Sequence, residues 1–167
     1  MPHTHCSLTI SLHAPGVTDA LIEQTAIPSP FTLLDAILEY EPARLAAARR
    51  FRRAPLWHGL ESMAQAAAMH QRALTDFTRH AFLLSCDVCR FTENRPLNGS
   101  ARIAVALCGQ SRNAARYDAL LTLEAHALCA CLHIGLMPYD ARFQEEILRL
   151  RYKEAFTCLL NARSTSR

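Results

Sequence analysis

One acidic residue, Glu61, interrupts an almost wholly apolar stretch that runs from Leu56 to Met69. Apolar residues over this length indicate a helix with much of its circumference buried. Burying a carboxylate is costly unless the group is paired, hydrogen-bonded or protonated. Gln65 follows four residues later, one helical turn away, where its amide can hold the carboxyl group. Glu61 is therefore the first candidate for chemistry; the alternative is a position at the rim of the buried face, reaching solvent.

A run of arginines comes directly before this helix and comprises Arg49, Arg50, Arg52 and Arg53. Most charge runs form solvated loops. A concentrated positive patch beside the mouth of an active site also steers and docks anionic partners. The residues alone leave both interpretations open.

Composition limits the class of protein. The chain has 167 residues, of which 50% are apolar, enough for one domain with a sizeable core. No apolar run reaches the roughly 20 residues of a membrane span, and the first residues lack a secretory signal pattern. The net charge of +3 is too small to indicate nucleic-acid binding. Seven cysteines, an odd number, indicate reduced thiols and a cytoplasmic location.

The sequence predicts no metal site and no serine nucleophile. Cys86 and Cys89 form a C-x-x-C pair, but the pair falls within a predicted strand and lacks a second pair at zinc-finger spacing. Cys129 and Cys131 share one strand face, as core residues do. No G-x-S-x-G motif occurs.

The elements that must position Glu61 follow from apolar periodicity and turn residues. Prolines and clusters of Asn, Gly and Ser separate the apolar runs. In one run Ile103, Val105 and Leu107 alternate with polar or small residues, as in a strand with one buried face. The predicted elements are a short helix at Thr18–Thr25, paired strands at Phe31–Tyr40 and Leu45–Phe51, a helix at Pro55–Leu74, strands at Phe82–Phe91, Ala101–Cys108, Tyr117–Glu124 and Ala125–Gly135, and an amphipathic helix at Asp140–Ala162.

One long helix followed by antiparallel strands predicts the α+β class, with a curved antiparallel sheet wrapped around one central helix. Tyr117–Gly135 also fits a single long bent strand. The expected organisation is a tail at 1–17, a domain at 18–139, and a helix and tail at 140–167. The apolar positions expected in this last helix include Phe143, Ile147, Leu150 and Phe156.

Four segments of the chain match motifs of one known family in the same order. Gly59–Ala66 places a Glu before Met-Ala-Gln, Phe31–Tyr40 and Phe82–Phe91 have the form of that family's flanking strands, and Pro96 and Gly99 fit its turn. These segments resemble the β-hydroxyacyl-acyl-carrier-protein dehydratases over roughly residues 20–137. The Pro-x-x-x-Gly-Leu-Glu form of the helix start is similar to the subtype in aryl-polyene and xanthomonadin pigment clusters.

The resemblance implies a hot-dog fold and the dehydration of 3-hydroxyacyl thioesters, without a cofactor, in a pigment or fatty-acid-like pathway. In that family a histidine removes the Cα proton, and a helix carboxyl from the other subunit protonates the leaving hydroxyl. Glu61 matches this carboxyl, with Gln65 orienting it. The amides of Gly59 and Leu60 are expected to polarise the thioester carbonyl, and the bare Cα of Gly59 to admit the acyl group.

The resemblance also implies partners. An acyl carrier protein would present the substrate on phosphopantetheine, and the cluster Arg49, Arg50, Arg52 and Arg53 would face its phosphate and acidic surface. The family's dimer joins two sheets edge to edge, so either a homodimer or a heterodimer with another hot-dog dehydratase is expected.

The chain departs from the family at the catalytic histidine. The stretch Ala46–Ala54, before the helix, contains no histidine. His58, three residues before Glu61, is the candidate base; alternatively it is only a helix-entry residue. Two further functions stay open. The chain is either a degenerate subunit that pairs with an active dehydratase, or an acyl thioesterase whose helix carboxylate activates water and needs no histidine.

Overall fold

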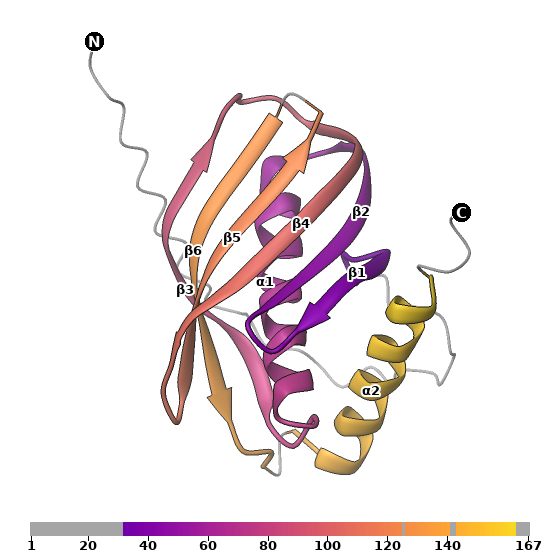
Figure 1. Ribbon diagram of the computed structural model, residues 1–167, viewed down its shortest axis with the longest axis vertical. Helices are drawn as coiled ribbons and strands as arrows, with labels where there is room; N and C mark the ends of the chain where they lie inside the picture. Colours follow the sequence, from indigo (N-terminus) through magenta and orange to yellow (C-terminus); the bar gives the residue numbers. More distant parts are fainter. Residues whose placement is uncertain (1–31, 125, 141–142, 163–167) are drawn as a thin grey trace, which may run out of the picture.

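A computed structural model describes residues 32–124, 126–140 and 143–162 of the chain (Figure 1). The helix predicted at Thr18–Thr25 and the first residue of the strand predicted at Phe31–Tyr40 lie outside these residues. The described elements are β1 (Ala36–Glu41), β2 (Arg44–Ala54), α1 (Leu56–Leu74), β3 (His80–Phe91), β4 (Leu97–Gln110), β5 (Ala114–Leu123), β6 (His126–Met137) and α2 (Glu145–Asn161).

The strands form one six-stranded antiparallel sheet in the order β1-β2-β4-β5-β6-β3. The predicted hairpin of the first two strands is present, with Ala36 opposite Ala48. Helix α1 packs on one face of the sheet against β2 to β6, and α2 lies beside β1 (Figure 1). The α+β class expected from the sequence is confirmed. None of the described helices is long and apolar enough to cross a membrane.

Helix α1 extends over the predicted range, with Pro55 as its N-cap rather than in its first turn. Most of its buried residues are small, among them Gly59, Ser62 and the alanines of Ala66–Ala68, and Met63 is fully buried beside them. Small side chains let the helix approach the strands closely, which strengthens dispersion contacts along its whole length.

The two strands β5 and β6 correct one of the alternatives drawn from the sequence. Tyr117–Gly135 does not form a single bent strand. Leu123 lies opposite His126, so the chain reverses at Glu124, whose φ of 51° is typical of a tight turn. Strand β4 is also longer than expected, because it begins at Leu97, inside the segment predicted to be a turn.

Helix α2 is shorter than predicted and begins at Glu145. It packs through Tyr152, Phe156 and Leu159. Ile147 and Leu150, which the sequence placed among its apolar positions, are 53% and 59% exposed. The reason is the rotation of the helix, which turns Tyr152 over the Arg72 guanidinium at 4.0 Å from the ring centroid.

A buried polar network joins α1 to the sheet. His70 and Gln71 are fully buried, and both contact the hydroxyl of Tyr117 at 2.7 Å. The other ring nitrogen of His70 lies 2.8 Å from the Glu41 carbonyl oxygen. If Nε2 carries the proton and donates to that carbonyl, the Tyr117 hydroxyl donates to Nδ1 and accepts from Gln71, so one neutral tautomer satisfies all three contacts.

This network predicts a loss of stability in acid. Burial lowers the pKa of His70 below its ordinary 6.5, and burial together with the positive charge of Arg72 lowers the pKa of His80. The unfolded chain therefore takes up protons at a higher pH than the folded chain does. The stability from the neutral rings is complete above pH 6.5 and is lost as the pH falls through the lowered folded pKa values. Urea unfolding between pH 7.5 and 5 should show a decline of at most about 1.4 kcal/mol per pH unit from each ring, and His70→Gln should remove the part of the decline that His70 contributes. A free energy of unfolding that does not change over this range would contradict the assignment.

Candidate active site

Glu61 lies in the second turn of α1, and Gln65 holds its carboxyl group. The Gln65 side-chain amide donates to Glu61 Oε1 at 3.0 Å, as expected from their spacing. The Gln65 carbonyl oxygen in turn accepts the backbone N–H of Leu33 at 2.8 Å. Since both ends of the Gln65 amide are engaged, its rotamer is fixed, and the Glu61 carboxyl is positioned by a chain of two hydrogen bonds.

Glu61 is half-buried rather than enclosed. The sheet-facing side of α1 is taken by Gly59, Ser62 and Met63, which turns Glu61 toward the opposite side. Trp57 projects from the same end of the helix and is 58% exposed. The arrangement combines the two interpretations of the sequence: the carboxylate sits at the rim of the buried face, yet it is held in place.

Gly59 and Leu60 are placed differently from the sequence expectation. A Cβ at Gly59 would lie 2.7 Å from Leu128 Cδ2 and 2.9 Å from Leu97 Cδ1, so its bare Cα faces the sheet and admits leucine methyls, not an acyl group. Because the helix begins at Leu56, the backbone N–H groups of Gly59 and Leu60 fall where helical geometry pairs them with carbonyls one turn earlier. The N–H of His58 also donates to the Pro55 carbonyl at 3.0 Å, so helical geometry leaves unpaired the N–H groups of Leu56 and Trp57 rather than those of Gly59 and Leu60.

The arginine cluster is part of β2, not a loop. Arg49 donates to Asp35 Oδ1 at 2.7 Å, and the backbone N–H of Arg50 donates to Asp35 Oδ2 at 2.6 Å. The register with β4 shifts between Phe51 and Ala54, and Arg53 has a φ of 50°. Such a bulge bends the strand and redirects the side chains of Arg52 and Arg53.

These arginines line an open hollow of about 560 Å³ together with His58. Arg50, Arg52 and Arg53 are exposed, and no residue in the described part of the chain forms an ion pair with their side chains. His58 is half-buried at the wall of the hollow, stacked edge-on with Trp57 at 4.0 Å between ring centroids. Unpaired guanidinium groups around a concave surface favour an anionic ligand such as a phosphate.

Comparisons with known proteins were made for sequence and for structure. No family model and no curated protein matches the sequence. Among solved structures, the dehydratase heterocomplex ApeI:P from Xenorhabdus doucetiae is 14% identical, with a TM-score of 0.55 over 74% of this chain and 93% of that one. A thioesterase from Pseudomonas aeruginosa is 13% identical, with a TM-score of 0.50 over 61% and 80%. A Streptococcus mutans protein bound to acetyl CoA is 10% identical, with a TM-score of 0.51 over 62% and 88%.

At these identities the comparison establishes architecture alone. The TM-scores of 0.50 to 0.55 show that these structures share the fold of this chain. The chain has the hot-dog fold. The prediction of this fold from four short motifs is confirmed at that level.

Within the hot-dog domain the other described histidines contact residues away from Glu61. His70 and His80 are buried; His80 stacks on Phe143 at 4.6 Å between ring centroids. His126 lies beside Glu93, and His133 beside Asp87. Their partners lie on other elements, and of the two histidines on α1, His58 and His70, only His58 lies one turn from Glu61.

Two participants in the site were missed by reasoning from the sequence. Asp35 anchors Arg49 and the start of the arginine-bearing part of β2, and its presence as the one acid inside an apolar run was a signal for such a role. The backbone of Leu33, which fixes Gln65, left no signal, because a main-chain donor is independent of residue type.

Proposed function

We propose that this chain is a hot-dog subunit that dehydrates 3-hydroxyacyl thioesters, with Glu61 as the general acid. The observation that carries the proposal is the carboxyl group of Glu61, fixed by Gln65 and Leu33 at a half-buried position one turn after His58. A carboxyl group that is both oriented and accessible can meet a substrate atom with a defined geometry.

The reaction requires a base and an acid on one acyl chain. The base takes the Cα proton, the Cα–H electron pair forms the double bond to C3, and the C3 hydroxyl leaves with the proton of Glu61 as water. His58 is the proposed base in this chain. In a heterodimer a histidine of another subunit would take that role, and Glu61 would complete a site built across the interface.

Two solved structures of the same fold lend support. One is described as a dehydratase heterocomplex, and another was solved with acetyl CoA, an acyl thioester. We propose that the present chain likewise acts on acyl thioesters, in the cytoplasm, within a polyene-pigment or fatty-acid-like pathway.

The arginine-lined hollow is proposed to receive the carrier. Arg52 and Arg53 project from the bulge of β2, beside the hollow that His58 also lines. The phosphate of phosphopantetheine would bind there, with the acidic surface of an acyl carrier protein outside it. Presentation of one 3-hydroxyacyl group on a carrier protein and on coenzyme A tests this, and kcat/KM should be higher for the carrier protein.

Charge reversal at the hollow gives a sharper result. The double substitution Arg52→Glu and Arg53→Glu is expected to raise KM for the carrier-protein substrate by roughly tenfold or more, because the acidic partner then meets like charge. The matched control is the pair of substitutions Arg112→Glu and Arg151→Glu, which reverses two exposed charges outside the hollow, one in the β4–β5 turn and one on α2. Equal effects of the double variant and of the control would show that net charge, not the hollow, governs docking.

Dimerisation is proposed to occur through β3. Within the described residues β3 pairs with β6 on one side only, and it exposes Leu84, Val88 and Phe91. An open, apolar edge strand is a template for pairing with a second sheet. A homodimer in solution agrees with self-pairing, whereas a monomer that dimerises only with another hot-dog subunit would identify the heterodimer.

An acyl thioesterase is the second candidate. It is favoured by a specific feature of the site: no histidine is among the described contacts of Glu61 and Gln65. Of the two histidines on α1, His58 lies three residues before Glu61, and His70 is buried against Tyr117. Hydrolysis needs only that Glu61 activates a water molecule, and one of the solved structures of the same fold is named a thioesterase. Release of free acid, rather than loss of water, would distinguish this reaction.

A further inference from the structure

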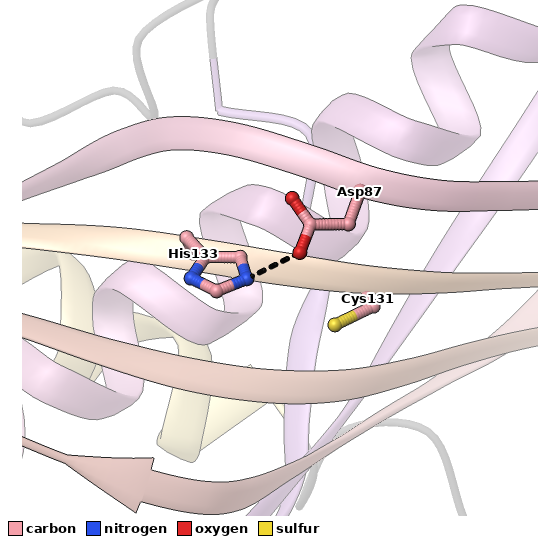
Figure 2. A group of neighbouring side chains, drawn as sticks. All are labelled: Asp87, Cys131 and His133. Carbon is pink, nitrogen blue, oxygen red and sulfur yellow. Dashed lines mark hydrogen bonds and ion pairs between the residues drawn. The ribbon is translucent and has the colours of Figure 1, made fainter. Parts of the chain in front are cut away.

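A second group of chemically competent side chains lies on the outer face of the sheet, away from α1. Asp87 of β3 and Cys131 and His133 of β6 converge there (Figure 2). Their ligand atoms all lie within 4.8 Å of one another, and His133 Nε2 is 2.8 Å from Asp87 Oδ2. Figure 2 shows the imidazole edge, the carboxylate and the thiol directed toward a common point.

The backbone explains why these three side chains share one face. Cys131 and His133 are two residues apart on β6, so both point away from the core, while Leu132 between them is fully buried. On β3 the register with β6 shifts between Cys86 and Val88, which makes Asp87 the extra residue of a β-bulge. A bulge re-aims a side chain, and here it brings the carboxylate to the imidazole.

The donor set fits a borderline-soft divalent cation of the zinc class. Tetrahedral zinc binds Cys sulfur, His nitrogen and Asp oxygen at about 2.0–2.3 Å, which places neighbouring ligand atoms about 3.3–3.8 Å apart. The separations here are 2.8 Å for one pair of ligand atoms and no more than 4.8 Å for the others. Side-chain rotations that move these atoms by about 1 Å bring them to that geometry. Three protein ligands leave a fourth position for water.

Charge balance supports the same class of ligand. An ionised aspartate and a thiolate together match a dication, and the imidazole stays neutral. Arg116 now donates to Cys131 Sγ at 3.2 Å. It is exposed, and Asp118, which lies opposite Cys131 in the β5–β6 register, is an alternative partner for its guanidinium. The side chain of Arg116 can therefore leave the sulfur without losing a counter-charge.

We propose that Asp87, Cys131 and His133 form a binding site for a zinc-class divalent cation on the outer face of the sheet. The site is separate from Glu61, because the ligands point to the side of the sheet opposite α1. In the metal-free protein His133 Nε2 lies 2.8 Å from Asp87 Oδ2; when the cation binds, it takes a position between these two atoms, and the carboxylate and imidazole become ligands together.

The test uses the reduced full-length protein titrated with Co²⁺, whose bond to a thiolate gives a sulfur-to-metal charge-transfer band in the near ultraviolet. We expect this band to saturate at one ion per chain, and added Zn²⁺ to abolish it. Cys131→Ser should remove the band. His133→Ala and Asp87→Ala should each weaken Co²⁺ binding by more than roughly tenfold, since loss of a direct ligand exceeds the effect of losing an outer partner.

The matched control is Cys129→Ser, which removes another thiol from the same face of β6. A second control is Cys6→Ser, because Cys6 lies near His3 and His5 in the sequence. Both variants should keep the band, and far-ultraviolet circular dichroism should show that every variant is folded. The proposal is overturned if the wild-type chain gives no thiolate band, if Cys131→Ser retains it, or if either control abolishes it.

Discussion

Replacing Glu61 with glutamine is expected to lower kcat for dehydration by at least about 10²-fold, because the amide cannot supply the proton that the leaving hydroxyl requires. Glutamine is nearly the same size as glutamate and can still contact Gln65, so the position on α1 stays occupied. The free energy of unfolding should therefore change little, since Glu61 is half-buried and makes one hydrogen bond to a side chain. Steady-state kinetics and urea unfolding of the same preparation measure both quantities.

The matched control for this substitution is Glu146→Gln, which removes an exposed carboxylate from α2. It should leave both the rate and the stability as they are. If Glu61→Gln keeps more than half of the wild-type rate, the carboxyl group is not the acid, and the site must be sought elsewhere in the domain.

Replacing Gly59 with valine is expected to lower the free energy of unfolding by about 1–3 kcal/mol, the usual cost of forcing extra carbons into a packed core. The first added carbon would lie 2.7 Å from Leu128 Cδ2 and 2.9 Å from Leu97 Cδ1, and both leucines are fully buried. They cannot move without displacing their own neighbours, so α1 must shift away from the sheet.

Gly109 offers the control for this experiment. It lies in β4, and a Cβ there would meet nothing within 4 Å. Gly109→Val should therefore leave the stability nearly unchanged, within about 0.5 kcal/mol. An unchanged free energy of unfolding for Gly59→Val, combined with a raised KM, would instead show that this glycine faces the acyl group, as the sequence alone suggested.

Periodicity and turn residues were sufficient to predict most of the fold. The apolar run with small residues placed α1 within one residue of its ends, and the alternation around Ile103 and Val105 identified β4. The pairing of Glu61 with Gln65 also followed from local spacing, since residues one turn apart on a helix are neighbours whatever surrounds them. Features of this kind depend on a few neighbouring residues, which is why a short stretch of sequence is enough to predict them.

What the sequence could not supply depends on long-range register. The bulge that turns Asp87 toward His133 exists only because β3 and β6 pair with a one-residue mismatch. The rotation of α1 that sets Gly59 against leucines is likewise a property of the packed sheet. The bulge in β2 at Arg52 and Arg53 belongs to the same class. Such features arise from the fit between distant strands, and no window of sequence contains them.

The most direct test of the account is the mass of the acyl product. A 3-hydroxyacyl carrier protein is incubated with the purified chain, and intact-mass spectrometry follows the acyl group. Dehydration by Glu61 predicts a loss of one water with the thioester intact, and no such loss with Glu61→Gln. Release of the hydroxy acid would contradict dehydration and identify a thioesterase. An unchanged substrate, with or without a second hot-dog subunit, would contradict a catalytic role for Glu61 altogether.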